Sequence, residues 1–278
     1  MQFKTLIDTP VDTVRECFNA AFAEYQFNIQ QTPERFAFKL KTELIDLSKS
    51  VGAFDGNAMV GFILFGIGMY NNKLTAWDGG TGVLPAYRGQ QLTEKMFAYI
   101  HPILKDEGFE QILLEVLTTN EAAFNIYKKN GFNVNRELHG YKGHLDTEPL
   151  KYNVEVLTNY DTDALLALGD WLPCWQQTNP AVINWGDVIQ TIGIRDSNKI
   201  IAYAHFNTVT NRVLQFAVHK NYRRKGMATA LFQCLSSQTQ EPIMVINIDG
   251  NSENTNSFLT AIGLEHFVSQ YEMIIPLI

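Results

Sequence analysis

The chain has little cysteine, no long apolar run and no excess of positive charge. Its three cysteines, Cys17, Cys174 and Cys234, are an odd number and lie far apart. This usage disfavours a disulfide framework and a thiolate zinc site, and it fits reduced thiols in the cytoplasm. The N-terminal segment lacks a signal-type apolar core, and the longest apolar stretch, residues 59–70, contains three glycines and is too short to span a bilayer. We therefore expect a soluble, cytoplasmic protein without a membrane partner.

Two further classes of function are disfavoured. The net charge of −7 argues against a nucleic-acid partner, because proteins that bind the phosphate backbone normally carry a basic excess. Five histidines show no metal-ligand spacing with one another, so we expect no metal: His101, His144, His205, His219 and His266. The GGTG segment at residues 79–82 has no third glycine at the interval of a dinucleotide-binding loop.

Two stretches of the chain share one pattern. Residues 83–97 read VLPAYRGQQLTEKMF, and residues 218–232 read VHKNYRRKGMATALF. In each, an apolar residue is followed by three spacers, Tyr-Arg, a short polar turn and a helical pattern. A chain of 278 residues is comfortable for two domains of about 130 to 140 residues each. The pattern therefore predicts a duplicated domain.

The order of expected elements supports the duplication. We predict strands from runs of apolar and β-branched residues, and helices from apolar periodicity. In the first half we expect a strand at 3–7, helices over 11–23 and 33–48, strands at 51–54, 59–67 and 74–83, a helix from 92, a strand at 111–117 and a helix over 122–129. In the second half we expect strands at 191–195, 199–206 and 213–218, a helix over 227–236, a strand at 243–248 and a helix ending at Gly263. The polar segment 143–151 is the expected boundary, which gives domains 1–146 and 147–278.

The second turn has the composition of an anion site. Arg223, Gly226 and Ala228 form an Arg-x-x-Gly-x-Ala turn that follows the strand ending at Val218 and leads directly into a helix. Such a turn directs backbone N–H groups and a helix N-terminus at one place, and small residues let a pyrophosphate approach. Arg224 and its neighbour lysine add positive charge. On these residues alone, a basic turn that binds nothing is an equal alternative.

The turn resembles the acetyl-CoA pyrophosphate loop of the GCN5-related N-acetyltransferases (GNAT). The first half also carries LLEVLTTNEAAFNIYKKNGF at residues 113–132, with Asn120, Ala123, Tyr127, Gly131 and Phe132 at the spacing of that family. Over essentially its whole length the chain thus resembles a tandem GNAT protein. The resemblance implies an α/β fold of two acyl-CoA N-acyltransferase domains, each with a mixed, splayed β-sheet and helices on both faces.

The resemblance further implies an acetyl-CoA-dependent N-acetyltransferase and roles for its residues. Tyr127 is the expected general acid for the thiolate, and Glu115 is the candidate base. A backbone N–H near Val83 would meet the oxyanion. Acetyl-CoA, as the acyl-donor substrate, is expected at Val83, Arg88, Gly89, Gln90, Gln91, Thr93 and Asn120. Taken singly, Tyr127 also fits a packing role and Glu115 a surface carboxylate.

The two halves depart from the family pattern in different ways. The first has Gln91 and Thr93 where the family has glycine and glycine or alanine. The second keeps a cleaner candidate cofactor loop, with Val218, Arg223, Arg224, Gly226 and Ala228. Counting back from Gly263, however, puts Leu259 and Asn247 at the positions of Tyr127 and Glu115. We expect the first domain to be catalytic and the second to be degenerate, and the alternative is that CoA binds only at the second loop.

The acceptor is the least determined part of this prediction. The resemblance implies a primary amine on a small molecule or peptide. Trp171, Trp175 and Trp185 favour a core between the domains, with a roof over the acceptor as the alternative, and residues 25–32 are another candidate wall. Two rival functions stay open: a non-catalytic acetyl-CoA sensor, and an acyltransferase that uses a different acyl-CoA. The oligomeric state is not indicated.

Overall fold

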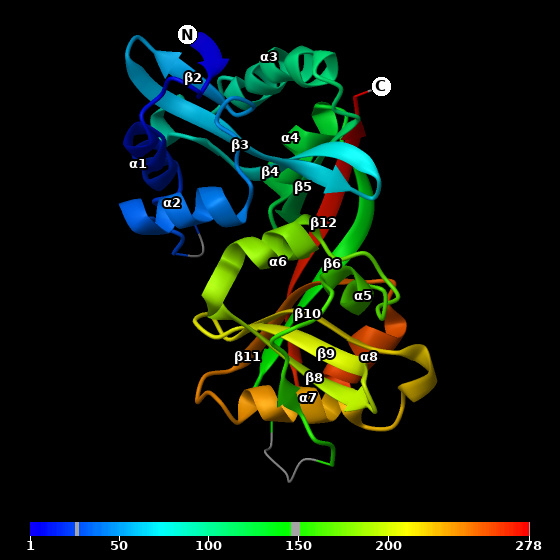
Figure 1. Ribbon diagram of the computed structural model, residues 1–278. Helices are drawn as coiled ribbons and strands as arrows, with labels where there is room; N and C mark the ends of the chain where they lie inside the picture. The colour runs from blue at the N-terminus through cyan, green and yellow to red at the C-terminus, as the bar shows by residue number, and fades with distance from the viewer. Residues whose placement is uncertain (26–27, 146–150, 278) are drawn as a thin grey trace. The chain divides into compact units, whose positions relative to one another are not determined.

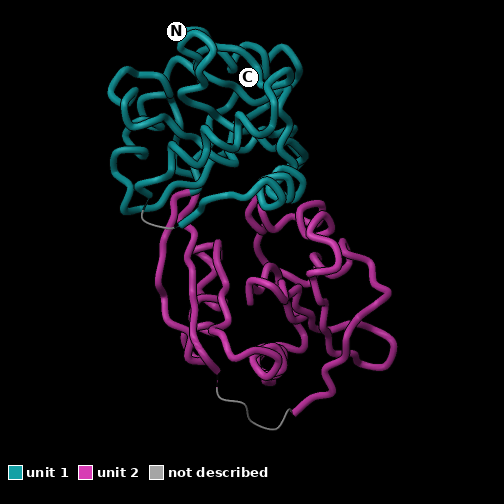
Figure 2. The backbone as a smooth tube through the Cα atoms, turned by 90° about the vertical axis from the view of Figure 1, so that its left-hand side faces the viewer, with its two compact units in different colours: residues 1–135, 272–278 teal, residues 136–271 magenta. Residues whose placement is uncertain are grey.

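The computed structural model describes residues 1–25, 28–145 and 151–277. The chain forms two compact units, coloured separately in Figure 2. Unit 1 comprises residues 1–135 and 272–278, and unit 2 comprises residues 136–271. Most of the expected boundary segment, residues 146–150, lies outside the described residues. The last residues of the chain thus belong to the unit formed by the N-terminal half.

Unit 1 contains the elements of the first repeat (Figure 1). In chain order they are β1 (Gln2–Thr5), α1 (Val11–Ala21), α2 (Pro33–Thr42), β2 (Val51–Asp55), β3 (Ala58–Tyr70), β4 (Lys73–Val83), the 3-10 turn η1 (Pro85–Tyr87), α3 (Leu92–Asp106), β5 (Gln111–Leu117) and α4 (Glu121–Lys129). Two further strands, β6 (Asn133–Gly143) and β12 (Glu265–Pro276), contain the points at which the chain passes from one unit to the other.

Unit 2 repeats this order with shorter helices at its start. Its elements are β7 (Glu155–Val156), α5 (Thr162–Leu166), η2 (Trp175–Gln177), α6 (Asn179–Trp185), η3 (Gly186–Val188), β8 (Ile189–Asp196), β9 (Lys199–Asn207), β10 (Arg212–Val218), η4 (Lys220–Tyr222), α7 (Met227–Ser236), β11 (Ile243–Asp249) and α8 (Glu253–Ala261). The pairs β10–α7 and β11–α8 correspond to β4–α3 and β5–α4 of unit 1.

Each unit has a mixed sheet that opens at one place. In unit 1 the strands β1, β2, β3 and β4 pair antiparallel, and β4 then pairs parallel with β5. The parallel pairing covers only Thr75–Trp77 of β4, although β4 continues to Val83. In unit 2 the parallel pairing of β10 with β11 covers only Arg212 and Val213. The expected splay of the sheet is therefore present in both units.

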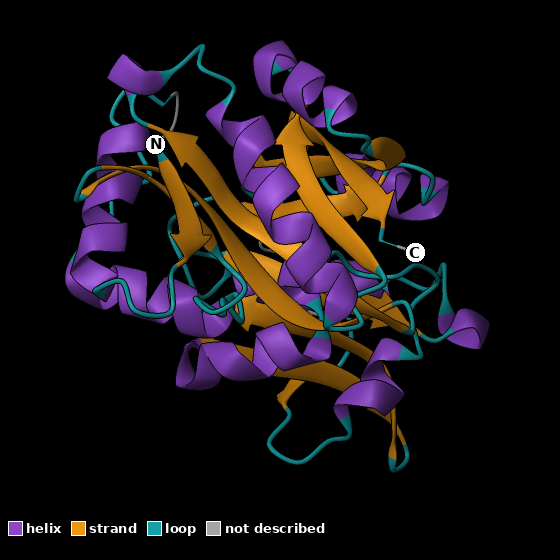
Figure 3. Cartoon of the chain, turned by 90° about the horizontal axis from the view of Figure 1, so that it is seen from above, coloured by secondary structure: helices purple, strands orange, loops and turns teal. Residues whose placement is uncertain are grey.

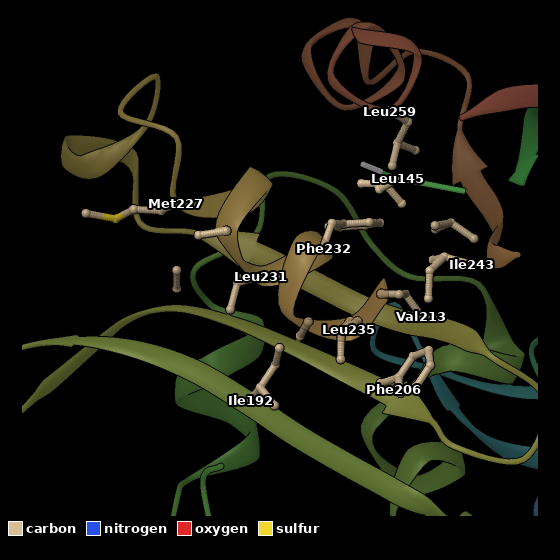
Figure 4. Packing of buried hydrophobic residues seen from close by; sticks show 14 of the residues in the cluster. Leu145, Ile192, Phe206, Val213, Met227, Leu231, Phe232, Leu235, Ile243 and Leu259 are labelled. Carbon is tan, nitrogen blue, oxygen red and sulfur yellow. The ribbon is translucent and has the colours of Figure 1, made fainter. Parts of the chain in front are cut away.

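Helices cover both faces of each sheet, as Figure 3 illustrates. In unit 1 the residues of β3 alternate between the faces. Phe62 packs with Phe18 of α1 and Phe36 of α2, whereas Phe65 contacts Phe97 of α3 on the opposite face. In unit 2, α7 and α8 bury Phe232 and Leu259 in one apolar cluster with the strands (Figure 4). These layers account for the apolar periodicity of the helices.

Most expected elements are present, and the main difference concerns the second helix. That helix ends at Thr42 and not near residue 48, because Leu44 takes a left-handed backbone conformation with φ of 57°. The amide of Ile45 then donates to the carbonyl of Leu40 at 2.8 Å, which closes the helix end. The short helices α5 and α6 and the strands β6, β7 and β12 had no clear signal in the sequence.

Candidate active site

Unit 1 contains a cleft of about 660 Å³ where β4 ends and where α3 and α4 begin. Seven residues expected at the site line it: Val83, Arg88, Gly89, Gln91, Thr93, Asn120 and Tyr127. Two others, Gln90 and Glu115, do not belong to the lining among the described residues. The fold therefore brings most of the expected cofactor residues and the expected acid into one cavity.

The N-terminus of α3 lies at this cleft without a side-chain cap. Gln91 occupies the N-cap position with φ of 58°, and Gly89 has φ of 76°. Because the first amides of any α-helix have no carbonyl partner within the helix, they are available to a ligand. The side chain of Gln91 is exposed, and its backbone conformation is one that glycine adopts at lower cost. Gln91 thus keeps the loop geometry in the absence of the family glycine.

Arg88 links the loop to the neighbouring backbone. Its Nε donates to the carbonyl of Val83 at 3.3 Å, and its Nη2 donates to the carbonyl of Ala21 at 3.1 Å. Its Nη1 also lies 3.4 Å from the Glu24 carboxylate. These contacts join the end of β4 to the end of α1. In the described structure, Arg88 acts as a brace of the loop.

Tyr127 is buried at the side of the cleft, with 9% of its surface exposed. Its ring makes edge contacts with Phe97 and Phe132. Asn120 starts the helix that carries it, because the Asn120 Oδ1 accepts a hydrogen bond from the Ala123 amide at 3.2 Å. Burial raises the pKa of Tyr127 well above its ordinary value, and the nearby Asp78 carboxylate adds to this effect. The phenol is therefore protonated at neutral pH.

Thr81 lines the cleft and Asp78 lies next to Tyr127, and the sequence revealed neither of these positions. The Thr81 Oγ1 donates to the Asp78 carboxylate at 2.5 Å, and the amide of Gly80 donates to it at 2.8 Å. Burial raises the pKa of Asp78 to about 6, although these hydrogen bonds and one from Tyr127 favour its charged form. The available signal was an acidic residue next to the glycine-rich segment 79–82.

Glu115 lies on the opposite face of the sheet from Tyr127. Leu113 of β5 pairs with Trp77 of β4, and strand alternation puts Glu115 on the same face as these two residues. Trp77 donates through Nε1 to the carbonyl of Glu43 at 2.9 Å, which places this face on the side of α2. The structure therefore does not bring Glu115 and Tyr127 into one cleft.

Unit 2 has a second cleft, of about 450 Å³, at the corresponding place. It is lined by all five residues of the second candidate loop: Val218, Arg223, Arg224, Gly226 and Ala228. Gly226 is the uncapped N-cap residue of α7, with φ of 87°. Arg223 braces this loop as Arg88 does in unit 1, because it donates to the carbonyls of Val218 (2.8 Å) and Leu168 (3.2 Å) and pairs with Asp170.

Asp78, Thr81 and Tyr127 have apolar counterparts in unit 2. The spacing that relates Val83 to Val218 also relates Asp78 to Val213 and Thr81 to Phe216. Leu259, at the position of Tyr127, is fully buried in the apolar cluster. Phe216 lies 5.0 Å from Phe232 and 6.0 Å from Phe258 between ring centroids. The second cleft therefore has an aromatic wall where the first has the hydroxyl group of Thr81.

The residues considered for the acceptor have separate environments. Tyr25, from the expected wall segment 25–32, lines the first cleft, while residues 26 and 27 lie outside the described residues. Trp171 lines the second cleft. Trp175 is 2% exposed, and Trp185 ends α6. Asn247, at the position of Glu115, is buried and accepts a hydrogen bond from Gln270 at 2.7 Å.

Fold and site together define a class of protein, the acyl-CoA N-acyltransferases, in which a helix N-terminus meets a splayed strand pair. The acetyltransferase (GNAT) family model matches residues 12–132 and 158–256. The chain therefore belongs to the GNAT family, and it carries two GNAT domains in tandem. No helix in the described part of the chain is long and apolar enough to cross a membrane.

Solved structures of low sequence identity share the fold over nearly the whole chain. A tandem GNAT protein from the clavulanic acid biosynthesis pathway is 11% identical, with a TM-score of 0.72, over 99% of this chain and 98% of that one. A GCN5-related N-acetyltransferase from Sphaerobacter thermophilus is 11% identical, with a TM-score of 0.69, over 99% and 95%. A glucosamine N-acetyltransferase region of a fungal multi-domain protein is 14% identical, with a TM-score of 0.72, over 99% and 38%.

Proposed function

We propose that the chain is an acetyl-CoA-dependent N-acetyltransferase of the cytoplasm, whose first domain, residues 1–146, transfers the acetyl group to a primary amine of a small molecule or peptide. The second domain, residues 147–278, is the degenerate copy. The observation that carries this proposal is the position of Tyr127, which is buried, protonated and part of the same cleft as the uncapped N-terminus of α3. At the matching position of unit 2 stands Leu259, whose side chain cannot protonate a leaving sulfur.

The donor would lie along β4 and α3. The amides of residues 89–93 would bind the pyrophosphate, in keeping with the anion preference of helix N-termini. The amide of Leu84 bonds across to the carbonyl of Val60 at 2.9 Å, so strand alternation directs the Val83 amide away from β3. The Val83 amide is then the donor that would stabilise the oxyanion of the thioester carbonyl. Arg88 would keep this loop in shape.

The proton transfers would occur on two faces of the sheet. A neutral amine attacks the thioester carbonyl, and Tyr127 gives its proton to the departing thiolate. Glu115, on the face that also bears Trp77, would take the proton of the amine from the acceptor side. Neither step needs a metal ion. Each positioned acid or base contributes about 10²- to 10⁴-fold to the rate of such a reaction.

The test is thiol release from acetyl-CoA and from longer acyl-CoA thioesters with a panel of small amines and N-terminal peptides. We expect release with at least one amine, and acetyl-CoA as the preferred donor. Tight CoA binding without thiol release in the presence of any amine would favour the sensor function. Preference for a longer acyl chain would favour the alternative of an acyltransferase that uses a different acyl-CoA. In the same assay, a Glu115→Gln variant that keeps full activity at every pH would remove Glu115 as the base.

A further inference from the structure

Asp78 owes its position to a β-bulge in β4. Phe65 of β3 pairs with Asp78 and Leu64 pairs with Gly80, so that Gly79 is the additional residue between them. Because paired residues share a face of the sheet, Asp78 points to the side on which Phe65 contacts Phe97 of α3. Tyr127 packs on the same Phe97 ring. The bulge therefore brings the carboxyl group under the phenol of α4.

The surroundings of the Asp78 carboxyl group are almost entirely neutral. Thr81 and the Gly80 amide occupy its oxygens from β4 itself, and Tyr127 hydrogen-bonds to it from α4. From the other elements, Lys39 of α2 contributes a favourable charge, and Tyr25 lies near Tyr127. Lys39 is itself paired with Glu43. A carboxylate without a direct cationic partner is costly to bury, so this arrangement needs a reason other than stability.

Unit 2 shows that the fold does not require these polar groups. There the same bulge occurs, since Phe206 pairs with Val213 and His205 pairs with Gln215. The positions of Asp78, Thr81 and Tyr127 are held by Val213, Phe216 and Leu259, and Val213 and Leu259 belong to the apolar cluster of Figure 4. The bulge is thus a property of both copies, whereas the polar trio is particular to the copy with the proposed activity.

We propose that Asp78 is a positioning residue for Tyr127 and that the two side chains act as a coupled proton donor to the CoA thiolate, with Thr81 fixing the carboxyl group. This inference rests on the proposed function of Tyr127. The S–H bond of CoA forms as the O–H bond of Tyr127 breaks, and the resulting phenolate takes the proton of the Asp78 carboxyl group. The carboxylate that remains regains, through solvent, the proton released by the amine. No phenolate then has to persist beside a buried carboxylate.

The coupling is tested first without turnover, by ¹³C NMR titration of the Asp78 carboxyl carbon, assigned with the Asp78→Asn variant. The phenol donates a hydrogen bond to the charged carboxylate and favours it. We therefore expect Tyr127→Phe to raise the pKa of Asp78 above its wild-type value of about 6. The matched control is the carboxyl carbon of Asp196, which accepts a hydrogen bond from Tyr222 in unit 2. Its signal is assigned with the Asp196→Asn variant. An Asp78 pKa unchanged by Tyr127→Phe would overturn the coupling, whatever the activity of the enzyme.

The second test is the pH dependence of turnover. The ratio of wild-type to Asp78→Asn rates cancels the titration of the acceptor amine, because both proteins use the same acceptor. Only the protonated carboxyl group can return a proton to Tyr127, so we expect this ratio to fall at least about tenfold between about pH 5.5 and 8. A ratio that is constant with pH would assign Asp78 a purely structural role. If Tyr127→Phe is inactive while Asp78→Asn is not impaired, the proposed function stands and this inference fails.

Discussion

Units 1 and 2 place nearly the same loop on the same fold, yet the interiors behind the loops differ. Arg88 and Arg223 each bond to the last carbonyl of the preceding strand. Each also bonds to a second carbonyl near the cleft, that of Ala21 at the end of α1 or that of Leu168 in the turn after α5. Behind the first loop lie Tyr127, Thr81 and Asp78, and behind the second lie apolar side chains. The loop is therefore a feature of the fold, and the proposed chemistry depends on the side chains that lie behind it.

The comparison also explains why the cleaner sequence motif is not the better candidate. Gly226 and Ala228 give unit 2 the family loop, but Leu259 and Val213 stand there at the positions of Tyr127 and Asp78. Unit 1 has Gln91 in the same left-handed position, with φ of 58° against 87° for Gly226. A less favourable residue in the loop costs about 1 kcal/mol, whereas a missing acid costs about 10²-fold or more in rate. The proton-transfer groups, and not the loop residue, therefore make unit 1 the better candidate for the active site.

The largest expected effect comes from Tyr127→Phe, which would make unit 1 resemble unit 2 at this position. We expect kcat to fall about 100-fold or more with little change in KM for acetyl-CoA, because the phenol acts on the leaving thiolate. Steady-state kinetics with the best amine of the panel provide the measurement. Leu259→Ala in unit 2 is the control for damage to packing. Unchanged turnover in Tyr127→Phe would return Tyr127 to a packing role.

A smaller effect is expected when a carboxylate enters each loop in turn. Gln91→Glu places a negative charge at the N-terminus of α3, where it would repel the pyrophosphate. We expect KM for acetyl-CoA to rise about 10- to 100-fold in this variant. Gly226→Glu does the same at α7 and should leave the kinetics nearly unchanged. The reverse result, measured with both proteins folded by circular dichroism, would move the donor site to unit 2.

Sequence alone was sufficient for the repeat, the two loops and the order of most elements, because each follows from local patterns. Tyr127 was identified from the resemblance to the GNAT family, which has a tyrosine at this spacing from the glycine at position 131. Asp78 was not, since its approach to Tyr127 depends on one extra residue in β4 and on the packing of α4 against α3. The face on which Glu115 lies likewise depends on its register with Trp77. Local sequence patterns do not specify how strands and helices that are distant in the chain align with one another.

The next smaller effect is expected from a change of Arg88, which braces the loop. Arg88→Gln removes the charged hydrogen bonds to Val83 and Ala21, so the loop that would bind the donor loses its support. We expect KM for acetyl-CoA to rise about tenfold, which corresponds to about 1.4 kcal/mol. Arg223→Gln should lower the thermal midpoint by a similar amount as Arg88→Gln and leave KM unchanged. Equal effects of the two variants on KM would show that both loops take part in donor binding.

The smallest effect concerns the backbone of the two N-cap residues. Gln91→Gly relieves a left-handed conformation that a residue with a side chain adopts at a cost, and Gly226→Gln introduces that cost at the matching position. A Cβ atom at Gly226 would meet no atom within 4 Å, so the conformation and not a clash would set the penalty. We expect changes of about 0.5 to 1 kcal/mol in opposite directions, measured by urea unfolding of the transition assigned to each unit. Since Gln91 acts in this scheme through its backbone, Gln91→Gly should also retain wild-type kcat, and a large loss of kcat would give its side chain a role in the reaction.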